Sequence, residues 1–345
     1  MKYNDFGKTG FKVSEIGLGG AGIGHAWGKT TDEECNALIK LALDNGINFF
    51  DTSPIYGNGK SELNIGKEFQ NINSSDREKI FLASKIRFNN NHELDNMEAY
   101  ISASVERSLK RLKVEYIDLI QIHHQVGKSR GSYKFRDAPP EFAPLLNYDD
   151  CILFAEIMDK FKKNGKVRFI GLTGWNGDLI TCGRLINSEE FSTIQILYNV
   201  LNQSADGLPP IGNDSDQGSG IIENNPNILN QSQLSKVGVI GIRSHAAGSI
   251  VEVLDREVDK QTEFYTSHIK ALELRKIANK YGINISELAL LFCIRNKKIS
   301  TTVPGVKNRM ELEESLNLIN KSIGYEIIEE IRNWYKGSIS QHLLK

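Results

Sequence analysis

Eight short apolar runs, rich in Ile, Val, Leu and Phe, recur along this chain of 345 residues. Each run is too short for a helix, and continuous apolar runs of this length are typical of parallel strands that are buried on both faces. The runs cover residues 15–20, 46–51, 79–85, 117–124, 167–173, 192–200, 237–244 and 300–305. Any fold for this chain must bury these eight segments together.

Between most of these runs lie segments whose apolar residues recur at helical spacing, such as Ile101, Val105 and Leu109. The predicted helices are residues 32–45, 95–112, 147–163, 267–281, 286–296 and 309–320. Regular alternation of strand and helix favours a single (β/α)8 TIM barrel, class α/β, over a doubly wound sheet. Residues 2–13 predict a small N-terminal β-hairpin, and the absence of any linker predicts one domain over residues 1–345.

The composition excludes several classes of protein. A net charge of −1 gives no field that would attract nucleic acid or an anionic membrane surface, and no apolar run approaches the roughly 20 residues of a membrane span. The first residues are too polar for a secretory signal. Four cysteines without a C-x-x-C pair predict neither a disulfide framework nor a metal site. We therefore expect a cytoplasmic protein with a small-molecule ligand, and its oligomeric state stays open.

Two connections are too long for plain loops of a barrel, residues 125–146 after the fourth run and 201–226 after the sixth. Both would emerge at the C-terminal face, where barrel enzymes build their active sites. For the part from 203 to 226, rich in Gly, Pro, Asn and Asp, local disorder and a substrate-covering role stay open as alternatives.

The stretch GLGGAG, residues 17–22, spells the G-x-G-x-x-G of a dinucleotide-binding Rossmann turn. That turn requires a helix that opens on the last glycine, whereas the first helical pattern of this chain begins near Asp32. We therefore expect the glycines to serve another purpose.

Ionisable residues stand at the ends of three successive runs. The second run ends at Asp51, with Tyr56 five residues later; the third ends at Lys85, and the fourth at His123 and His124. Their order predicts one polar site over the mouth of the barrel. Singly, each residue has an ordinary structural explanation, such as a turn cap for Asp51 or packing for Tyr56. Adjacent histidines on a strand point to opposite faces, so only one of the two can face the site.

The set also has a chemical logic. A phenol has a pKa near 10, and a neighbouring ammonium group lowers it. Asp51 would hold Lys85 in place and charged, Lys85 would make Tyr56 acidic, and Tyr56 would give its proton to an oxygen. His123 would orient that oxygen. This arrangement suits hydride transfer to the adjacent carbon.

These segments resemble the aldo-keto reductase superfamily over about residues 5–320. The stretches that carry the likeness are GINFFDTSPIYGNGKSE, LASK, SLKRLKVEYIDLIQIHH, GKVRFIGLT, IQILYNVLNQ and TVPGVKNRMELEESL, in the family's order. The resemblance implies a barrel that binds NAD(P)(H) across its C-terminal face without a Rossmann fold. It implies that Asp51, Tyr56, Lys85 and His123 form the catalytic tetrad.

The resemblance also implies a set of cofactor contacts. Gly19, Gly20 and Asp51 would lie by the nicotinamide half, with small residues letting it approach the backbone. Where the family often has Ser-Asn, Thr173 keeps the hydroxyl and Gly174 loses the amide. The full set of predicted contacts is Gly19, Gly20, Asp51, Thr173, Gln195, Arg243, Ser244, Gly305, Lys307, Arg309 and Glu314.

At the adenosine end, Lys307 with Arg309 nearby favours NADP(H) over NAD(H), because a 2′-phosphate needs a basic partner. Ser315 stands in place of the family's usual asparagine, which weakens the match at this end.

The implied activity is an NAD(P)(H)-dependent oxidoreductase that interconverts a carbonyl (aldehyde, ketone or sugar) and an alcohol, with Tyr56 as general acid and base. FIGLTG and FFDTSPIYG are also similar to the aldose and L-galactose dehydrogenase branch, which oxidises sugars with NAD. A non-catalytic, nucleotide-sensing binding module of the same fold is the other alternative, and the complete tetrad argues against it.

Overall fold

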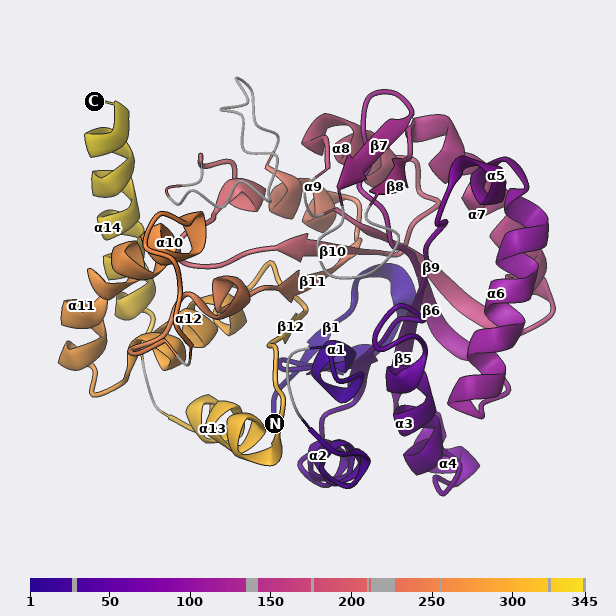
Figure 1. Ribbon diagram of the computed structural model, residues 1–345, viewed down its shortest axis with the longest axis horizontal. Helices are drawn as coiled ribbons and strands as arrows, with labels where there is room; N and C mark the ends of the chain where they lie inside the picture. The colour runs from indigo at the N-terminus through magenta and orange to yellow at the C-terminus, as the bar shows by residue number, and fades with distance from the viewer. Residues whose placement is uncertain are drawn as a thin grey trace.

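The computed structural model describes residues 1–26, 30–134, 142–174, 177–209, 211, 227–254, 256–321 and 324–343. Figure 1 shows strands at the centre of the molecule and helices around them. The strands of the central sheet, in chain order, are β3 (Leu18–Gly19), β4 (Phe49–Asp51), β5 (Phe81–Ile86), β6 (Ile117–Ile122), β9 (Val167–Thr173), β10 (Thr193–Leu197), β11 (Gly238–Ile242) and β12 (Thr301–Val303).

These eight strands form one parallel sheet in which spatial neighbours follow the chain order. The two ends of the sheet meet where Ile16 forms a parallel bridge with Thr302. There the amide of Gly17 donates to the carbonyl of Thr302 at 2.9 Å, and the amide of Thr302 donates to the carbonyl of Glu15 at 2.9 Å. The barrel predicted from the eight apolar runs is therefore confirmed, whereas the extent of the domain over residues 1–345 stays a prediction.

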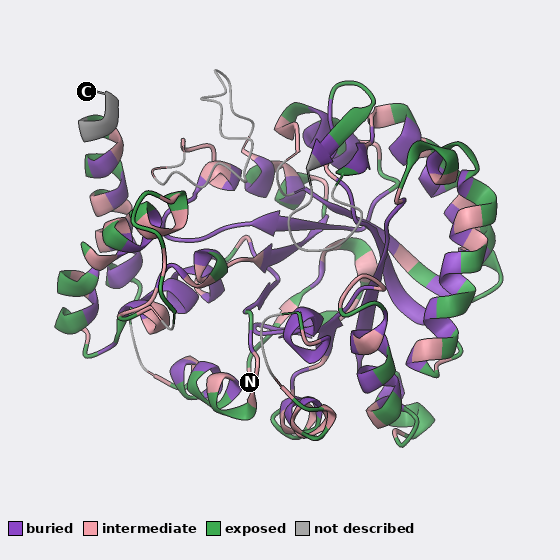
Figure 2. Ribbon diagram, in the orientation of Figure 1, coloured by how far each residue is buried: buried purple, intermediate pink, exposed green. Residues whose placement is uncertain are grey.

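The helices surround the barrel and turn their apolar faces toward it (Figure 2). They are α1 (Gly20–Ile23), α2 (Asp32–Asp44), α3 (Lys60–Phe69), α4 (Ser74–Arg77), α5 (Asn91–Asp95), α6 (Met97–Leu112), α7 (Tyr148–Lys163), α8 (Leu179–Asn187), α9 (Ile228–Leu234), α10 (Glu263–Leu272), α11 (Arg275–Lys280), α12 (Ile285–Ile294), α13 (Arg309–Ile319) and α14 (Glu326–Leu343). The predicted helix at 267–281 is two helices, α10 and α11. The sequence analysis also missed α1, α3, α4, α5, α8, α9 and α14.

Helix α3 shows why a local pattern can fail. Gly66 lies inside this helix, and glycine is a poor helix former. A Cβ atom at Gly66 would lie 2.2 Å from the carbonyl oxygen of Arg111, at the end of α6. The glycine is therefore needed for close packing between two helices, and the sequence alone does not reveal that contact.

The predicted N-terminal hairpin is confirmed and consists of β1 (Tyr3–Asp5) and β2 (Lys12–Ser14). It closes the amino-terminal end of the barrel. Phe6, between its strands, is fully buried and packs edge-to-face on Phe49 at 5.5 Å and on Phe81 at 5.0 Å between ring centroids. Phe49 and Phe81 are the first residues of β4 and β5. An apolar cluster thus fills the amino-terminal end of the barrel, and the ionisable side chains Asp51 and Lys85 lie at the other end.

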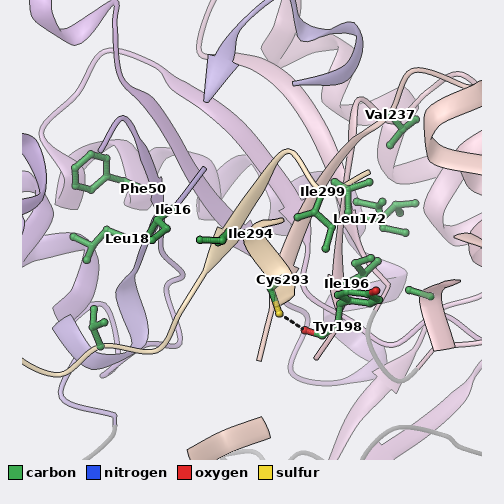
Figure 3. Packing of buried hydrophobic residues seen from close by; sticks show 14 of the residues in the cluster. Ile16, Leu18, Phe50, Leu172, Ile196, Tyr198, Val237, Cys293, Ile294 and Ile299 are labelled. Carbon is green, nitrogen blue, oxygen red and sulfur yellow. Dashed lines mark hydrogen bonds between the residues drawn. The ribbon is translucent and has the colours of Figure 1, made fainter. Parts of the chain in front are cut away.

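A second core lies between the outer faces of the strands and the helices (Figure 3). In it the thiol of Cys293 contacts the carbonyl oxygen of Tyr198 at 3.2 Å. Burial raises the pKa of all four cysteine thiols, that of Cys182 to about 12. The cysteines are therefore packing residues, held as neutral thiols at physiological pH.

The long connection after β6 contains secondary structure that the sequence analysis did not predict. It contains an antiparallel hairpin of β7 (Gly131–Lys134) and β8 (Phe142–Leu145), and residues 135–141 lie outside the described residues. Of the connection after β10, the structure describes a 3₁₀ turn at Ser204–Asp206. Most of the stretch from 203 to 226 (residue 210 and residues 212–226) lies outside the described residues, so its order stays untested.

In the described part of the chain, no helix is both long and apolar enough to cross a membrane. The same residues contain no group of three or more His, Cys, Asp or Glu side chains placed to hold a metal ion.

Replacing Phe6 with alanine tests the closure of the barrel. Because Phe6 is fully buried between Phe49 and Phe81, we expect Phe6→Ala to lower the free energy of unfolding by about 3–5 kcal/mol, measured by urea denaturation. Phe142→Ala, at a side chain that is 56% exposed, is the control and should change it by less than about 1 kcal/mol. Equal losses in both variants would contradict the role given to Phe6.

Candidate active site

The carboxyl ends of β4, β5 and β6 bring the predicted tetrad together. The Lys85 ammonium nitrogen lies 2.6 Å from Oδ2 of Asp51 and 3.3 Å from the hydroxyl oxygen of Tyr56. It also donates to the carbonyl oxygen of Thr52 at 3.0 Å. Asp51 and Lys85 are buried, and Tyr56 is half-buried. The structure thus joins carboxylate, ammonium and phenol in one chain of contacts.

Alternation along the strands explains this grouping. Side chains two residues apart on a strand share a face, so Leu119, Gln121 and His123 point in one direction from β6 and its extension. Leu119 lies in the barrel cluster, which makes this the inner face. Gln121 donates from Nε2 to Oδ1 of Asp51 at 3.1 Å, so both carboxylate oxygens of Asp51 are engaged. The sequence analysis did not single out Gln121.

The charges of the site follow from its burial. Burial lowers the pKa of Lys85, but the neighbouring Asp51 carboxylate and Tyr56 outweigh it, and the pKa of Lys85 is raised overall. Lys85 is therefore an ammonium ion at neutral pH. Burial raises the pKa of Tyr56 above its ordinary value, and the Lys85 charge only partly opposes this. Lys85 does act to lower the pKa of Tyr56, as the sequence analysis expected, but burial outweighs it, so the net pKa is raised and Tyr56 keeps its proton at neutral pH.

His123 faces Tyr56 across the site, with ring centroids 5.9 Å apart and planes at 89°. Burial, together with the positive charge of Lys85, holds the pKa of His123 well below its ordinary value, so the imidazole is neutral. Its Nδ1 lies 3.1 Å from the hydroxyl oxygen of Ser53. That hydroxyl also accepts from the amide of Ile55 at 3.4 Å, and its own proton can be donated to Nδ1. We propose this arrangement, which places the proton of the His123 ring on Nε2.

Ser53 is a residue that the sequence analysis missed. It lies two positions after Asp51 and is fully buried. The sequence did contain an indication of this position, because a residue two positions after Asp51 on an extended segment points to the same side as Asp51. A buried serine there has an ordinary structural explanation until its partner on another strand is known.

His124 points away from the site, in agreement with the expectation that only one of the two histidines can face it. Its Nε2 accepts from the amide of Phe88 at 2.7 Å, and its ring stacks on that of Phe88. Its Nδ1 lies 2.9 Å from the carbonyl oxygen of Pro144, which belongs to β8 of the hairpin. Burial lowers the pKa of His124 to about 3. His124 therefore anchors the hairpin to the barrel.

Two predicted nicotinamide contacts lie on neighbouring strands, where Gln195 of β10 is paired with Thr173 of β9. Gln195 is buried, and among the described residues its Nε2 finds no hydrogen-bond partner. Thr173 donates to the carbonyl oxygen of Ile122 at 2.6 Å, so its hydroxyl can only accept from a ligand. A buried amide without a partner is unfavourable unless a ligand pairs with it, and the carboxamide of a nicotinamide ring is a ligand of that chemistry.

The glycines of the G-x-G-x-x-G stretch have a packing reason. A Cβ atom at Gly20 would lie 2.5 Å from Oγ of Ser61 and 2.7 Å from the carbonyl oxygen of Asp51. At Gly19 it would lie 3.0 Å from a methyl of Val303. A single helical turn, α1, follows at once, although the sequence analysis expected no helix here. The chain's own contacts therefore explain why both positions are glycine, and their cofactor contact stays a prediction.

Arg243 and Ser244 follow β11. Arg243 adopts a left-handed backbone with φ of 57°, and its carbonyl oxygen accepts from Nδ2 of Asn199 at 3.0 Å. Its charge acts on Tyr56, lowering the pKa of that phenol as the smallest of the influences upon it. Ser244 is buried, with its hydroxyl 3.1 Å from Nδ1 of His245.

Of the predicted adenosine contacts, Gly305 and Lys307 precede α13, Arg309 is its first residue and Glu314 lies within it. Gly305 and Glu314 are exposed, and Lys307 is half-buried. Arg309 forms an ion pair with Glu34 of α2 at 3.1 Å. The sequence analysis took Arg309 as a cation available to a phosphate, and the structure pairs it with a carboxylate instead.

The fold and this geometry define a (β/α)8-barrel protein with a buried cluster of ionisable side chains at the carboxyl-terminal mouth. Residues 15–336 match the sequence model of the Aldo/keto reductase family. The chain belongs to that family, whose members are oxidoreductases that use nicotinamide cofactors and act on small carbonyl substrates.

Known proteins of similar sequence and fold agree with this assignment. The chain is 26% identical over 346 residues to "L-galactose dehydrogenase" of Arabidopsis thaliana, covering 96% of each chain. It is 26% identical over 330 residues to "Aldo-keto reductase yakc [NADP(+)]" of Schizosaccharomyces pombe, covering 93% of this chain and 88% of the relative. The solved structure of aldo-keto reductase AKR11C1 from Bacillus halodurans, holo form, superposes with a TM-score of 0.72 at 20% identity, over 96% of each chain.

The hydrogen bond between Ser53 and His123 gives a testable tautomer. We expect Ser53→Ala to convert His123 from pure Nε2–H to a mixture of tautomers, because Nδ1 loses the donor that holds it deprotonated. The ¹⁵N chemical shifts of the ring nitrogens, measured by NMR, report this directly. Ser53→Thr keeps the hydroxyl and should keep the single tautomer. Unchanged shifts in Ser53→Ala would contradict the assignment.

Proposed function

We propose that this protein is an NAD(P)(H)-dependent oxidoreductase that interconverts a carbonyl and an alcohol, with Tyr56 as the general acid and base. The single observation that carries the proposal is the contact chain Asp51–Lys85–Tyr56, with a neutral His123 facing the phenol. The buried side-chain nitrogen Nε2 of Gln195, which has no partner in the described part of the chain, supports the fit of a nicotinamide carboxamide.

Each residue of the site has a separate role in the proposed reaction. A nicotinamide, when bound, supplies or takes the hydride. Tyr56 donates its proton to the substrate oxygen as that oxygen becomes an alkoxide, and the Lys85 ammonium at 3.3 Å stabilises the phenolate that remains. His123 donates a hydrogen bond from Nε2 to the same oxygen and so orients the carbonyl toward Tyr56. Asp51, held by Gln121, keeps Lys85 charged and fixed.

The same groups can work in the direction of oxidation. Tyr56 as a phenolate would take the proton of an alcohol while its hydride leaves. The similarity to L-galactose dehydrogenase over nearly the whole chain supports a sugar as the substrate and oxidation at its anomeric carbon. We therefore propose an aldose as the first substrate class to test, with simple aldehydes as the second.

Turnover tests the proposal. The protein is incubated with NAD⁺ or NADP⁺ and a panel of aldoses, and with NADH or NADPH and 4-nitrobenzaldehyde, while absorbance at the reduced nicotinamide is followed. Turnover of at least one substrate is expected. Binding of a nicotinamide nucleotide with no turnover across both panels would favour a nucleotide-sensing module instead.

Removing one oxygen tests Tyr56. We expect Tyr56→Phe to lower kcat by about 10²–10⁴-fold, because the substrate oxygen loses its proton donor, while the dissociation constant of the nucleotide changes little. Tyr116→Phe is the matched control, because Tyr116 precedes β6 at the opposite end of the barrel. Turnover in Tyr56→Phe equal to that of the control would refute the role.

The raised pKa of Tyr56 predicts how each direction depends on pH. Reduction needs the protonated phenol, so its kcat should stay flat from pH 6 to pH 9 and fall only above the ordinary pKa of tyrosine. Oxidation needs the phenolate, so its kcat should rise with pH over the same range. His123 is neutral throughout and adds no step near pH 6.5. Stopped-flow measurement of the hydride step checks both profiles, and a fall in reduction between pH 6 and pH 8 would contradict them.

A further inference from the structure

The two basic residues at the start of α13 are each held by a carboxylate. Arg309 donates from Nε to Oε1 of Glu34 at 3.2 Å and from Nη2 to Oε2 at 3.1 Å, which makes a bidentate ion pair. The amide of Arg309 donates to Oε1 of Glu34 at 2.9 Å as well. Glu34 therefore occupies both the side chain and the backbone donor that an anion would use at this helix end.

Lys307 has the same kind of neighbour. Its amide donates to Oε2 of Glu311 at 2.8 Å, and its ammonium nitrogen lies 3.6 Å from Oε1 of Glu311. Two carboxylates, one from α2 and one from α13, thus stand beside the two cations from which the sequence analysis inferred a 2′-phosphate site.

Helix α2 brings Glu34 to this position by its own capping. Thr31 caps the helix by accepting from the amide of Glu34, which fixes the first turn. Helices α2 and α13 lie side by side at the lower edge of Figure 1. The hydrogen bonds from Arg309 hold the pKa of Glu34 below its ordinary value, so the carboxylate is charged at neutral pH.

We propose that Glu34 and Glu311 make this protein selective for NAD(H) over NADP(H), which reverses the preference inferred from Lys307 and Arg309 alone. A 2′-phosphate carries close to two negative charges and would have to displace Glu34 from Arg309 in the presence of Glu311. A ribose 2′-hydroxyl carries no charge and can donate a hydrogen bond to a carboxylate, which is how acidic residues select NAD elsewhere. The inference rests on the proposed function, since it takes this helix end as the adenosine site.

Binding, without turnover, tests the inference. NADH and NADPH are titrated into the intact protein and followed by nicotinamide fluorescence, and ADP and 2′,5′-ADP are then used to displace the bound dinucleotide. We expect NADH to bind at least about tenfold more tightly than NADPH, and ADP to compete better than 2′,5′-ADP. The variant carrying both Glu34→Gln and Glu311→Gln should bind NADPH about tenfold more tightly than the unsubstituted protein, with NADH affinity changed by less than about threefold.

Glu33→Gln and Glu313→Gln form the matched control, because both residues are exposed acidic positions on the same two helices. Neither should change the ratio of NADH to NADPH affinity. Tighter or equal binding of NADPH by the unsubstituted protein would overturn the inference and leave the proposed function intact. Absence of binding by either dinucleotide would overturn both.

Discussion

The active end of the barrel depends on the buried ion pair between Lys85 and Asp51. An unpaired ammonium ion inside a protein is so unfavourable that the group would lose its proton, and here a carboxylate at 2.6 Å prevents this. Removing one partner of such a pair typically costs about 3–5 kcal/mol, because the other charge stays buried. The remaining features of the site, the phenol beside Lys85 and Gln121 beside Asp51, are arranged around this pair.

The pair can exist only because the barrel separates its two ends. Phe6, Phe49 and Phe81 fill the amino-terminal end with apolar rings, and the ion pair between Asp51 and Lys85 lies at the carboxyl-terminal end. The inner side chains along β4 show the change within two residues, from Phe49 in the apolar cluster to Asp51 in the ion pair. Two neighbouring positions on one strand face thus contribute to the apolar core and to the buried ion pair respectively.

This separation also decides how much could be predicted from the sequence. The eight strands and the grouping of Asp51, Tyr56, Lys85 and His123 follow from runs that end in ionisable residues, a signal within single segments. Ser53 and Gly66 were missed because their partners, His123 and Arg111, lie on other elements. The net direction of the Tyr56 pKa shift was predicted wrongly because burial outweighs the Lys85 charge, and the burial of a side chain cannot be inferred from the local sequence.

The charges around the start of α13 were harder to predict from the sequence, because the residues that pair there are far apart along the chain. Lys307 and Arg309 form a basic pair in the sequence, while Glu34 lies on α2, near the other end of the chain. Closure of the barrel between Ile16 and Thr302 brings the segments after β3 and β12 together, and with them α2 and α13. The contacts around Asp51 and Lys85 are therefore fixed by residues on three adjacent strands, whereas the ion pair between Glu34 and Arg309 forms where the first and last strands meet. A family resemblance that matches residues one at a time can identify residues within single segments. It does not reveal an ion pair between segments that are distant in the sequence.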